Sequence, residues 1–140
     1  SARPVDLEFG PELSLLGFEV HPSSETPART QDGTLWHVSL YWRAEAPVRS
    51  DYTVSVRPLR DGALVLDASG EPLIQDHQPV WNSYPTSRWS PGEIVRDDYV
   101  LYLPDAQVPD TARIVVYRRT ETGFENLGES QLDLTSDDAE

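Results

Sequence analysis

Alternation of apolar and polar side chains with a period of two most strongly limits what this chain can fold into. The pattern runs through TLWHVSLYW (34–42), YTVSVRPLR (52–60) and VRDDYVLYL (95–103). Successive side chains of a β-strand point to opposite faces, so a segment that alternates in this way forms a strand with one buried face. We therefore predict core strands over these three segments. The side chains expected in the core are Val38, Leu40, Val54, Val56 and Leu101.

Shorter apolar segments separated by turn residues extend the pattern over the rest of the chain. The Asp61-Gly62 pair between two such segments indicates a hairpin. No window of about 11 residues carries a helical stripe. Roughly seven to nine short strands with regular turns are typical of an all-β domain, and we predict an immunoglobulin-like or jelly-roll β-sandwich. The further strands are expected at 5–9, 13–20, 63–67, 112–119 and 124–134, the last as one piece or two.

The length of 140 residues corresponds to about one domain. We assign residues 1–134 to a single β-sandwich domain and the acidic end TSDDAE (135–140) to a frayed tail. Between Gly70 and Trp89 the sequence forms one long irregular segment that three prolines interrupt. Long loops in compact domains are usually functional or disordered, and the aromatic residues of this one argue against disorder.

The net charge of −13, from 24 acidic and 11 basic residues, limits the partners of the domain. A nucleic-acid partner requires a basic face that neutralises phosphates, so we expect no nucleic acid, and the same charge disfavours an anionic membrane surface. No apolar run approaches the ~18 residues of a membrane helix, and we expect no direct membrane insertion by this segment. The partners that remain are a glycan or another protein, and we expect the isolated domain to be a monomer.

Recognisable catalytic motifs are absent from the sequence. The three histidines stand in no spacing that suggests a Ser-His-Asp triad, and there is no Gly-x-Ser-x-Gly motif. Asp97 and Asp98 are neighbours on a predicted strand, so they point to opposite faces and cannot be the facing carboxylates of a glycosidase. We predict no enzymatic activity. We expect Asp97 to be an inward acid that accepts hydrogen bonds from the loop 84–93.

Metal sites have little support in the sequence. Without cysteine, three scattered histidines make a poor tetrahedral zinc set. No Asp-x-Asp-x-Asp loop supplies the roughly six to eight oxygens of a calcium site. Isolated oxygen ligands are available from Asp76 beside His77 and from Asp105 with Asp110. We predict no metal and no cofactor.

Three aromatic residues of the irregular segment, Trp81, Tyr84 and Trp89, support two interpretations. They can form a platform for a sugar ring, because ligand sites are mostly apolar with a few convergent polar groups. Alternatively, Trp89 closes the open end of the sandwich with its indole N–H on a backbone carbonyl, and the loop that contains it is an architectural clasp. The polar residues that would complete a sugar site are Asp76, Asn82 and Arg88.

The clasp interpretation carries further expectations about this loop. Gly92 takes the positive φ that a type II turn requires after Pro91. The Thr86 and Ser87 hydroxyls bond locally to backbone amides. Arg88 is free to pair with an acid such as Asp97 or Glu93.

Several phrases of the sequence resemble a known protein family. The most specific is YPTSRW (84–89) followed by PGE (91–93), Asp97 and Tyr99. Over about residues 9 to 127 the chain resembles the soluble C-terminal module of bacterial multi-spanning glycosyltransferases of the dolichyl-phosphate-mannose protein mannosyltransferase type, which also occurs in related uncharacterised membrane proteins. The further matching phrases are GTL (33–35), LYW (40–42), DYTV (51–54), Asp61-Gly62 and Gln75-Asp76.

The resemblance implies a β-sandwich on the extracytoplasmic face of a bacterial membrane, within a larger anchored protein whose transferase chemistry lies elsewhere. We therefore expect a non-catalytic accessory or interaction module of a membrane-anchored glycosyltransferase-like protein. The alternative is a carbohydrate-binding module that uses the loop aromatics 81–89. Two ring faces on one surface would favour the sugar site, and burial of all three rings would oppose it.

Overall fold

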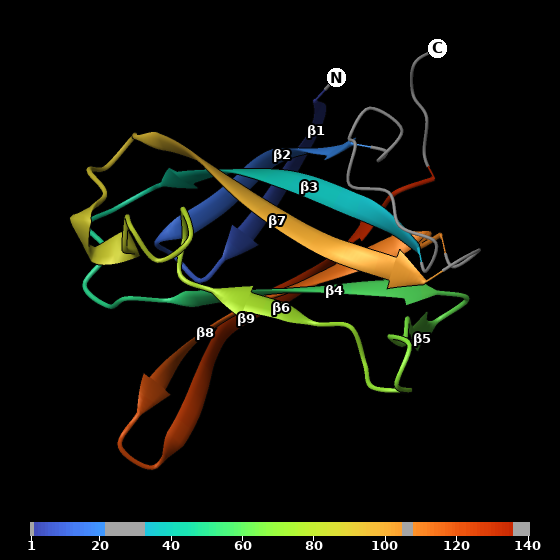
Figure 1. Cartoon of the computed structure of the whole chain (residues 1–140). Helices are drawn as coiled ribbons and strands as arrows, with labels where there is room; N and C mark the ends of the chain where they lie inside the picture. Colours follow the sequence, from blue (N-terminus) through green and yellow to red (C-terminus); the bar gives the residue numbers. More distant parts are fainter. Residues whose placement is uncertain (1, 22–32, 105–107, 136–140) are drawn as a thin grey trace.

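The computed structural model describes residues 2–21, 33–104 and 108–135. Two antiparallel β-sheets contain most of these residues and pack against each other as a β-sandwich (Figure 1). Within the described part of the chain the only helical element is a single 3-10 turn, η2 (Thr86–Arg88). The predicted all-β sandwich is therefore confirmed.

The first sheet has four strands in the order β1-β2-β3-β7. β3 and β7 pair in one unbroken register, from Gly33 opposite Pro104 to Arg43 opposite Ile94. β7 is consequently an edge strand, with one side on β3 and the other turned toward the edge of the second sheet. The strands are β1 (Arg3–Phe9), β2 (Leu13–His21), β3 (Gly33–Ala44) and β7 (Ile94–Pro104).

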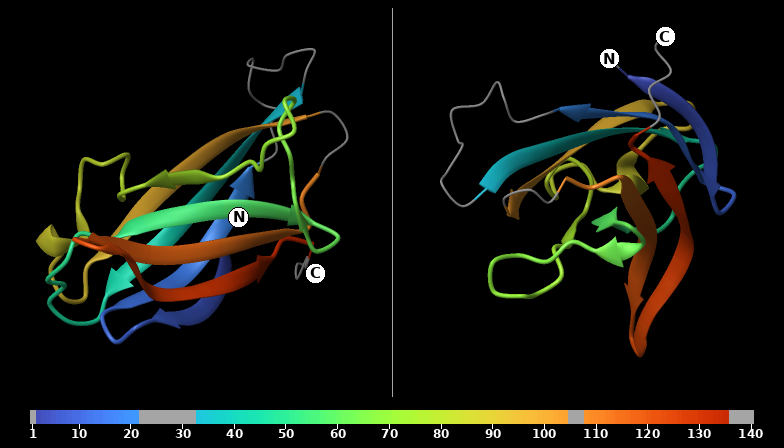
Figure 2. Two further views of the ribbon diagram at one scale, coloured as in Figure 1. Left: turned by 90° about the horizontal axis from the view of Figure 1, so that it is seen from below. Right: turned by 90° about the vertical axis from the view of Figure 1, so that its right-hand side faces the viewer.

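The second sheet has five strands in the order β5-β4-β8-β9, with β6 also paired to β4. β5 pairs with the end of β4 and β6 with its beginning. The β8–β9 hairpin extends beyond the body of the sandwich in both Figure 1 and Figure 2. The strands are β4 (Thr53–Arg60), β5 (Ala63–Leu64), β6 (Gln75–His77), β8 (Thr111–Thr120) and β9 (Gly123–Asp133).

The core lies between the inner faces of the two sheets and follows the predicted alternation. On β7 every second residue from Val95 to Leu103 is buried. Phe9 packs edge-on against Trp42, with ring centroids 5.2 Å apart, and both side chains are fully buried. All five side chains predicted to be buried lie in this core, namely Val38, Leu40, Val54, Val56 and Leu101.

The structure differs from the prediction in its short elements. The predicted strand 63–67 is reduced to β5, and β9 is one continuous strand rather than two pieces. The irregular segment 70–89 contains β6, which three residues are too few to reveal by alternation. The hairpin at Asp61-Gly62 is confirmed, since both residues have the positive φ of a type I′ turn, +54° and +82°.

The chain remains part of the domain up to Leu134. The Leu134 side chain is buried, and its N–H donates to Asp110 O at 2.9 Å. Residues 136–140 of the predicted tail lie outside the described residues. The two open sides of the sandwich are flanked differently, with β1 beside β9 on one side and β6 beside β7 on the other.

Candidate functional site

The residues predicted to form a site lie in β6 and in the segment that connects it to β7, but they do not form one surface. The three aromatic rings differ in exposure. Trp81 is 50% exposed, Tyr84 is half-buried and Trp89 is only 4% exposed. One ring therefore presents a free face, and the pair of exposed rings that would favour a sugar platform is not formed. The six predicted residues are Asp76, Trp81, Asn82, Tyr84, Arg88 and Trp89.

Trp81 stands on a left-handed turn. Val80, Trp81 and Asn82 all have positive φ, between +52° and +68°. A β-branched residue such as Val80 rarely enters this region, and strain of this kind costs of order 1–3 kcal/mol per residue. Asn82 Oδ1 accepts a hydrogen bond from Gln78 N at 2.8 Å, and Ser83 Oγ donates to Val80 O at 2.5 Å. Asn82 therefore stabilises the turn and is not a free group at the edge of a sugar site.

The turn rests on aromatic rings that lead into the core. The His77 ring stacks parallel to Tyr99, with centroids 4.1 Å apart, and Trp81 packs against the same histidine at 4.2 Å. His77 Nδ1 lies 2.7 Å from Gln78 O, and Nε2 lies 3.2 Å from Asp98 O. A carbonyl oxygen only accepts, so both contacts are hydrogen bonds when the imidazole carries both protons. Trp81 is thus an exposed ring that packs on two buried rings, His77 and Tyr99.

Asp97 is the buried acid beside these rings. Its side chain has no exposed surface; Oδ1 accepts a hydrogen bond from Val80 N at 2.8 Å, and Oδ2 accepts one from the Tyr99 hydroxyl at 2.6 Å. Burial raises the pKa of Asp97 to about 6, against the lowering effect of these hydrogen bonds and of His77. The inward direction was predicted correctly. The predicted partner, the loop 84–93, was wrong, because the turn at Val80 lies over this carboxylate.

Trp89 belongs to the core and not to a binding surface. Its indole Nε1 donates to Tyr84 O at 3.0 Å, and the two rings lie 6.2 Å apart. The Tyr84 hydroxyl donates to Glu93 Oε2 at 2.7 Å, and Ser90 N donates to Glu93 Oε1 at 2.8 Å. These bonds close the loop on itself. The expected burial of Trp89 with its indole N–H on a backbone carbonyl is confirmed.

Thr86 ties the same loop to the segment before β4. Its hydroxyl donates to Ser50 O at 2.6 Å and accepts from Tyr52 N at 3.0 Å, and its side chain is fully buried. The expectation that Thr86 bonds locally was wrong, because the loop packs against residues 50–52 and Thr86 finds its amide partner there, at Tyr52. The segment 84–93 is thus fastened to the chain just before the start of β4.

The turn that leads into β7 has the predicted form. Gly92 has a φ of +87°, and Glu93 N donates to Ser90 O at 2.9 Å. With φ of Pro91 held negative by its ring, this is a type II turn. Gly92 N also donates to Ala44 O at 2.7 Å, which joins the turn to the end of β3.

Arg88 and Asp76 do not complete a site around Trp81. The Arg88 side chain is exposed and makes no ion pair with a described residue. Of the two acids expected to meet it, Asp97 is buried beneath Val80, and Glu93 accepts hydrogen bonds from Tyr84 and Ser90. Asp76 Oδ2 accepts a hydrogen bond from the Tyr117 hydroxyl at 2.6 Å. Burial and this bond raise the pKa of Tyr117 to about 12. Asp76 and its neighbour His77 point to opposite faces of β6. Trp81 packs on the His77 ring, so Asp76 points away from Trp81.

A polar cluster that the sequence did not predict lies on the outer face of the first sheet. The Ser39 hydroxyl donates to Asp98 Oδ1 at 2.6 Å, and Arg96 Nε donates to the same oxygen at 3.1 Å. Nε2 of His21 and Nε2 of His37 each lie 3.5 Å from Ser39 Oγ. Although partial burial raises the pKa of Asp98, its hydrogen bonds bring that pKa below the ordinary value. Only the strand register, with Ser39 opposite Asp98 and His21 opposite His37, brings these residues together.

The cluster is not arranged as a catalytic relay. In a Ser-His-Asp triad the carboxylate holds Nδ1 of the histidine while Nε2 takes the serine proton. Here Asp98 Oδ1 lies 3.3 Å from His37 Nε2, and the Ser39 hydroxyl already donates to the same carboxylate. The histidine therefore does not stand between the serine and the acid.

Within residues 2–21, 33–104 and 108–135, no three His, Cys, Asp or Glu side chains are grouped so that they could hold a metal ion. Of the isolated ligands named above, Asp105 lies outside the described residues. No helix of the same ranges is long and apolar enough to cross a membrane.

Comparison with known proteins provides no relative for this chain. No family model, no curated protein and no solved structure matches it. The family resemblance of the sequence therefore stays a prediction.

Proposed function

We propose that this domain is a non-catalytic interaction module on the extracytoplasmic face of a bacterial membrane, within a larger glycosyltransferase-like protein that anchors it. The observation that carries the interaction role is Trp81, a half-exposed ring on a strained left-handed turn above His77. Backbone strain of this kind clusters at functional sites. A ring that is already held in place also loses little conformational entropy when a partner binds. The placement at a membrane rests on the sequence resemblance.

The strand pairing supports an immunoglobulin-like version of the sandwich over a jelly roll. The neighbours β2–β3, β3–β7, β4–β8 and β8–β9 correspond to the pairs A–B, B–E, C–F and F–G of the immunoglobulin fold. Sandwiches of this kind gather their loops at the two ends and use them for recognition. The Trp81 turn, between β6 and β7, is such a connection.

A carbohydrate-binding module is the second candidate, and the exposed indole of Trp81 is the observation that favours it. Because Trp89 is buried and Tyr84 is bonded to Glu93, a sugar site would rest on Trp81 alone among the three rings. Of the three polar residues predicted for that site, Arg88 is the one whose side chain makes no hydrogen bond or ion pair with a described residue, whereas the side chains of Asn82 and Asp76 are already hydrogen-bonded.

The gene context tests the placement at a membrane. We expect the reading frame upstream of residue 1 to encode roughly ten or more apolar segments of ~20 residues each. A full-length protein without such segments would contradict the anchored, glycosyltransferase-like part of the proposal.

Binding and turnover assays on the purified domain test the rest. A glycan array is probed with the parent, with Trp81→Ala and with Phe124→Ala, which removes another exposed aromatic ring far along the chain (64% exposed). A glycan signal lost in Trp81→Ala and kept in Phe124→Ala would select the carbohydrate-binding candidate. Robust glycosidase or esterase turnover, abolished by one Asp or Glu substitution in a folded variant, would overturn the non-catalytic role.

A further inference from the structure

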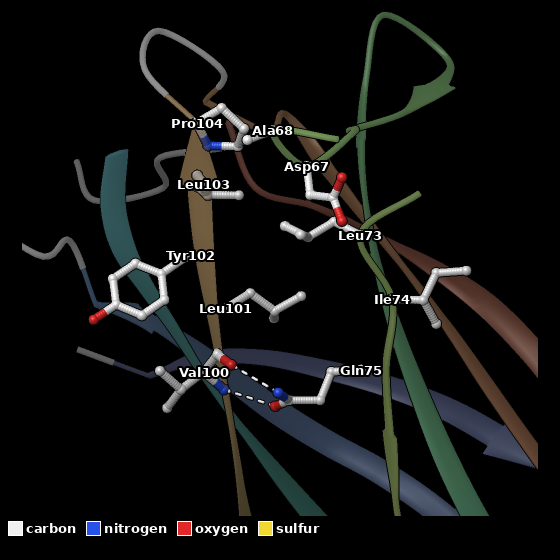
Figure 3. A pocket seen from close by; sticks show the side chains of 10 residues that line it. All are labelled: Asp67, Ala68, Leu73, Ile74, Gln75, Val100, Leu101, Tyr102, Leu103 and Pro104. Carbon is white, nitrogen blue, oxygen red and sulfur yellow. Dashed lines mark hydrogen bonds between the residues drawn. The ribbon is translucent and has the colours of Figure 1, made fainter. Parts of the chain in front are cut away.

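A groove of about 540 Å³ lies between β7 and the segment that leads into β6 (Figure 3). Leu73, Leu101 and Leu103 turn into this gap, and Asp67 lies beside Leu73 at its margin. The walls of the groove therefore carry apolar side chains. Because β7 is an edge strand, the groove also has the free backbone edge of a sheet along one side.

The backbone of β7 presents hydrogen-bonding groups to the groove. In an antiparallel pair, the N–H and C=O groups of successive residues point alternately toward the partner strand and away from it. Those of Val100 point away from β3, because Val100 N donates to Gln75 Oε1 at 2.9 Å and Gln75 Nε2 donates to Val100 O at 2.7 Å (dashed in Figure 3). The N–H and C=O of Tyr102, two residues further in the same unbroken register, therefore point into the groove. No described residue bonds to them.

Gln75 shows what kind of group fits this edge. A carboxamide offers a donor and an acceptor, as a peptide group does, and so replaces a neighbouring strand opposite Val100. One step back along β7, His77 Nε2 meets Asp98 O at 3.2 Å. The β6 side chains His77 and Gln75 therefore occupy the outer edge of β7 at Asp98 and Val100. Beyond Val100, where the groove lies, no β6 side chain covers this edge.

We propose that the groove binds an extended, basic peptide segment of a partner protein, which adds to the free edge of β7 at Tyr102 and inserts one apolar side chain among Leu73, Leu101 and Leu103. This inference deepens the proposed interaction function and rests on it. Strand addition explains both features of the groove, since main-chain bonds supply affinity and a pocket for alternate side chains supplies specificity. Pro104 has no N–H, so the addition centres on Tyr102.

The charge of the molecule favours a basic partner over a second copy of this chain. Backbone hydrogen bonds, first that from Glu71, lower the pKa of Asp67, so the carboxylate at the groove is ionised at neutral pH. Two copies of a domain with net charge −13 repel each other, whereas a segment with Lys or Arg beside its apolar residue is attracted.

Amide hydrogen exchange with a defined probe tests the proposal. The probe is an acetylated and amidated peptide of about ten alternating valine and lysine residues, long enough for one strand. In the free domain we expect the Tyr102 amide to exchange fast while the Val100 amide is protected by Gln75. Saturation with the peptide should slow exchange at Tyr102. A control peptide methylated at every backbone nitrogen has the same charge but lacks those donors in either strand direction, and should bind about tenfold more weakly or worse.

Two pairs of variants locate the contact on the domain. Tyr102→Pro removes the outward N–H and should weaken peptide binding about tenfold, while Tyr102→Ala keeps that N–H and should bind as the parent does. Proline is tolerated on an edge strand where its nitrogen faces away from the sheet. Ala68→Arg fills the groove with a bulky cation, and Ala63→Arg adds the same group on exposed β5 outside it. If Tyr102→Pro does not fold, the arginine pair decides.

Equal affinity for the two peptides, or equal effects of Ala68→Arg and Ala63→Arg, would show general adsorption to an acidic surface and overturn the proposal. Protection of Tyr102 that grows with protein concentration in the absence of peptide would identify a second copy as the occupant and overturn it as well. None of these readouts depends on the upstream gene or on Trp81. A failed groove therefore leaves the proposed function standing, and a missing membrane anchor leaves the groove standing.

Discussion

At the scale of the residue, hydrogen bonds decide which polar groups remain available for recognition. Asp97 and Thr86 are completely buried, and each makes a hydrogen bond that holds a loop in place. Alternation along β7 was enough to predict that Asp97 points inward. Its partner at Val80 was not predictable, because the path of a loop depends on contacts between segments distant in the sequence. The contact of Thr86 with residues 50–52 was not predictable for the same reason.

Asp97 should make the stability of the domain depend on pH. Its folded-state pKa is raised from 3.8 to about 6, so the folded protein holds this proton more tightly than the unfolded chain. The stabilising contribution is complete below about pH 4 and is lost as the pH rises through about 6. In urea unfolding, Asp97→Asn should therefore gain up to about 3 kcal/mol relative to the parent between these pH values. A difference between the two proteins that does not change with pH would contradict this role.

Thr86→Val should destabilise the domain although the two side chains have nearly the same shape. The substitution leaves Ser50 O and Tyr52 N without their partner, at a cost of about 1–3 kcal/mol for each buried group. Thr120→Val, at an exposed position, is the matched control and should change the free energy of unfolding by less than about 0.5 kcal/mol. Equal midpoints of denaturant unfolding for the two variants would show that the loop is not fastened through this hydroxyl.

At the scale of the element, long strands were predictable and short ones were not. β3 and β7 alternate over many residues, so their faces could be assigned from sequence alone. β6 has three residues and no visible period, yet it carries Gln75 and His77, which cover the edge of β7. The cluster around Ser39 depends on strand order and register, which composition and local pattern do not encode.

The turn between η2 and β7 should depend on backbone conformation and not on space. Gly92 has a φ of +87°, and apart from its two chain neighbours no residue lies within 4 Å of a Cβ placed there. Gly92→Val should therefore cost about 2 kcal/mol through strain alone, and Gly92→Asn clearly less, because asparagine tolerates this region. Thermal or urea unfolding of both variants measures the difference. A valine variant as stable as the asparagine variant would mean that the turn is not held in this conformation.

At the scale of the whole molecule, the sandwich combines a closed core with two surfaces that the fold leaves open. One is the ring of Trp81, and the other is the groove along β7. The fold class was predictable because it follows from many alternating residues at once. The open surfaces were only partly predictable, since exposure of a ring or of a strand edge is a property of the assembled sheets.

The isolated domain should be a monomer. Its net charge of −13 opposes association, and Gln75 and His77 cover part of the exposed edge of β7. Sedimentation velocity at moderate salt should show a single species of monomer mass. A concentration-dependent dimer would show that the remaining edge pairs with itself.

Urea unfolding of Trp89→Ala beside Trp81→Ala tests most directly the central claim, that the loop aromatics are divided between architecture and recognition. Trp89 is buried with its indole N–H on Tyr84 O, so its removal should cost about 3–5 kcal/mol, a large part of a total stability of roughly 5–15 kcal/mol. Trp81 is half-exposed, and its removal should cost about 1 kcal/mol. A Trp89→Ala variant that unfolds at the midpoint of the parent, or a Trp81→Ala variant that loses as much stability as Trp89→Ala, would contradict the account.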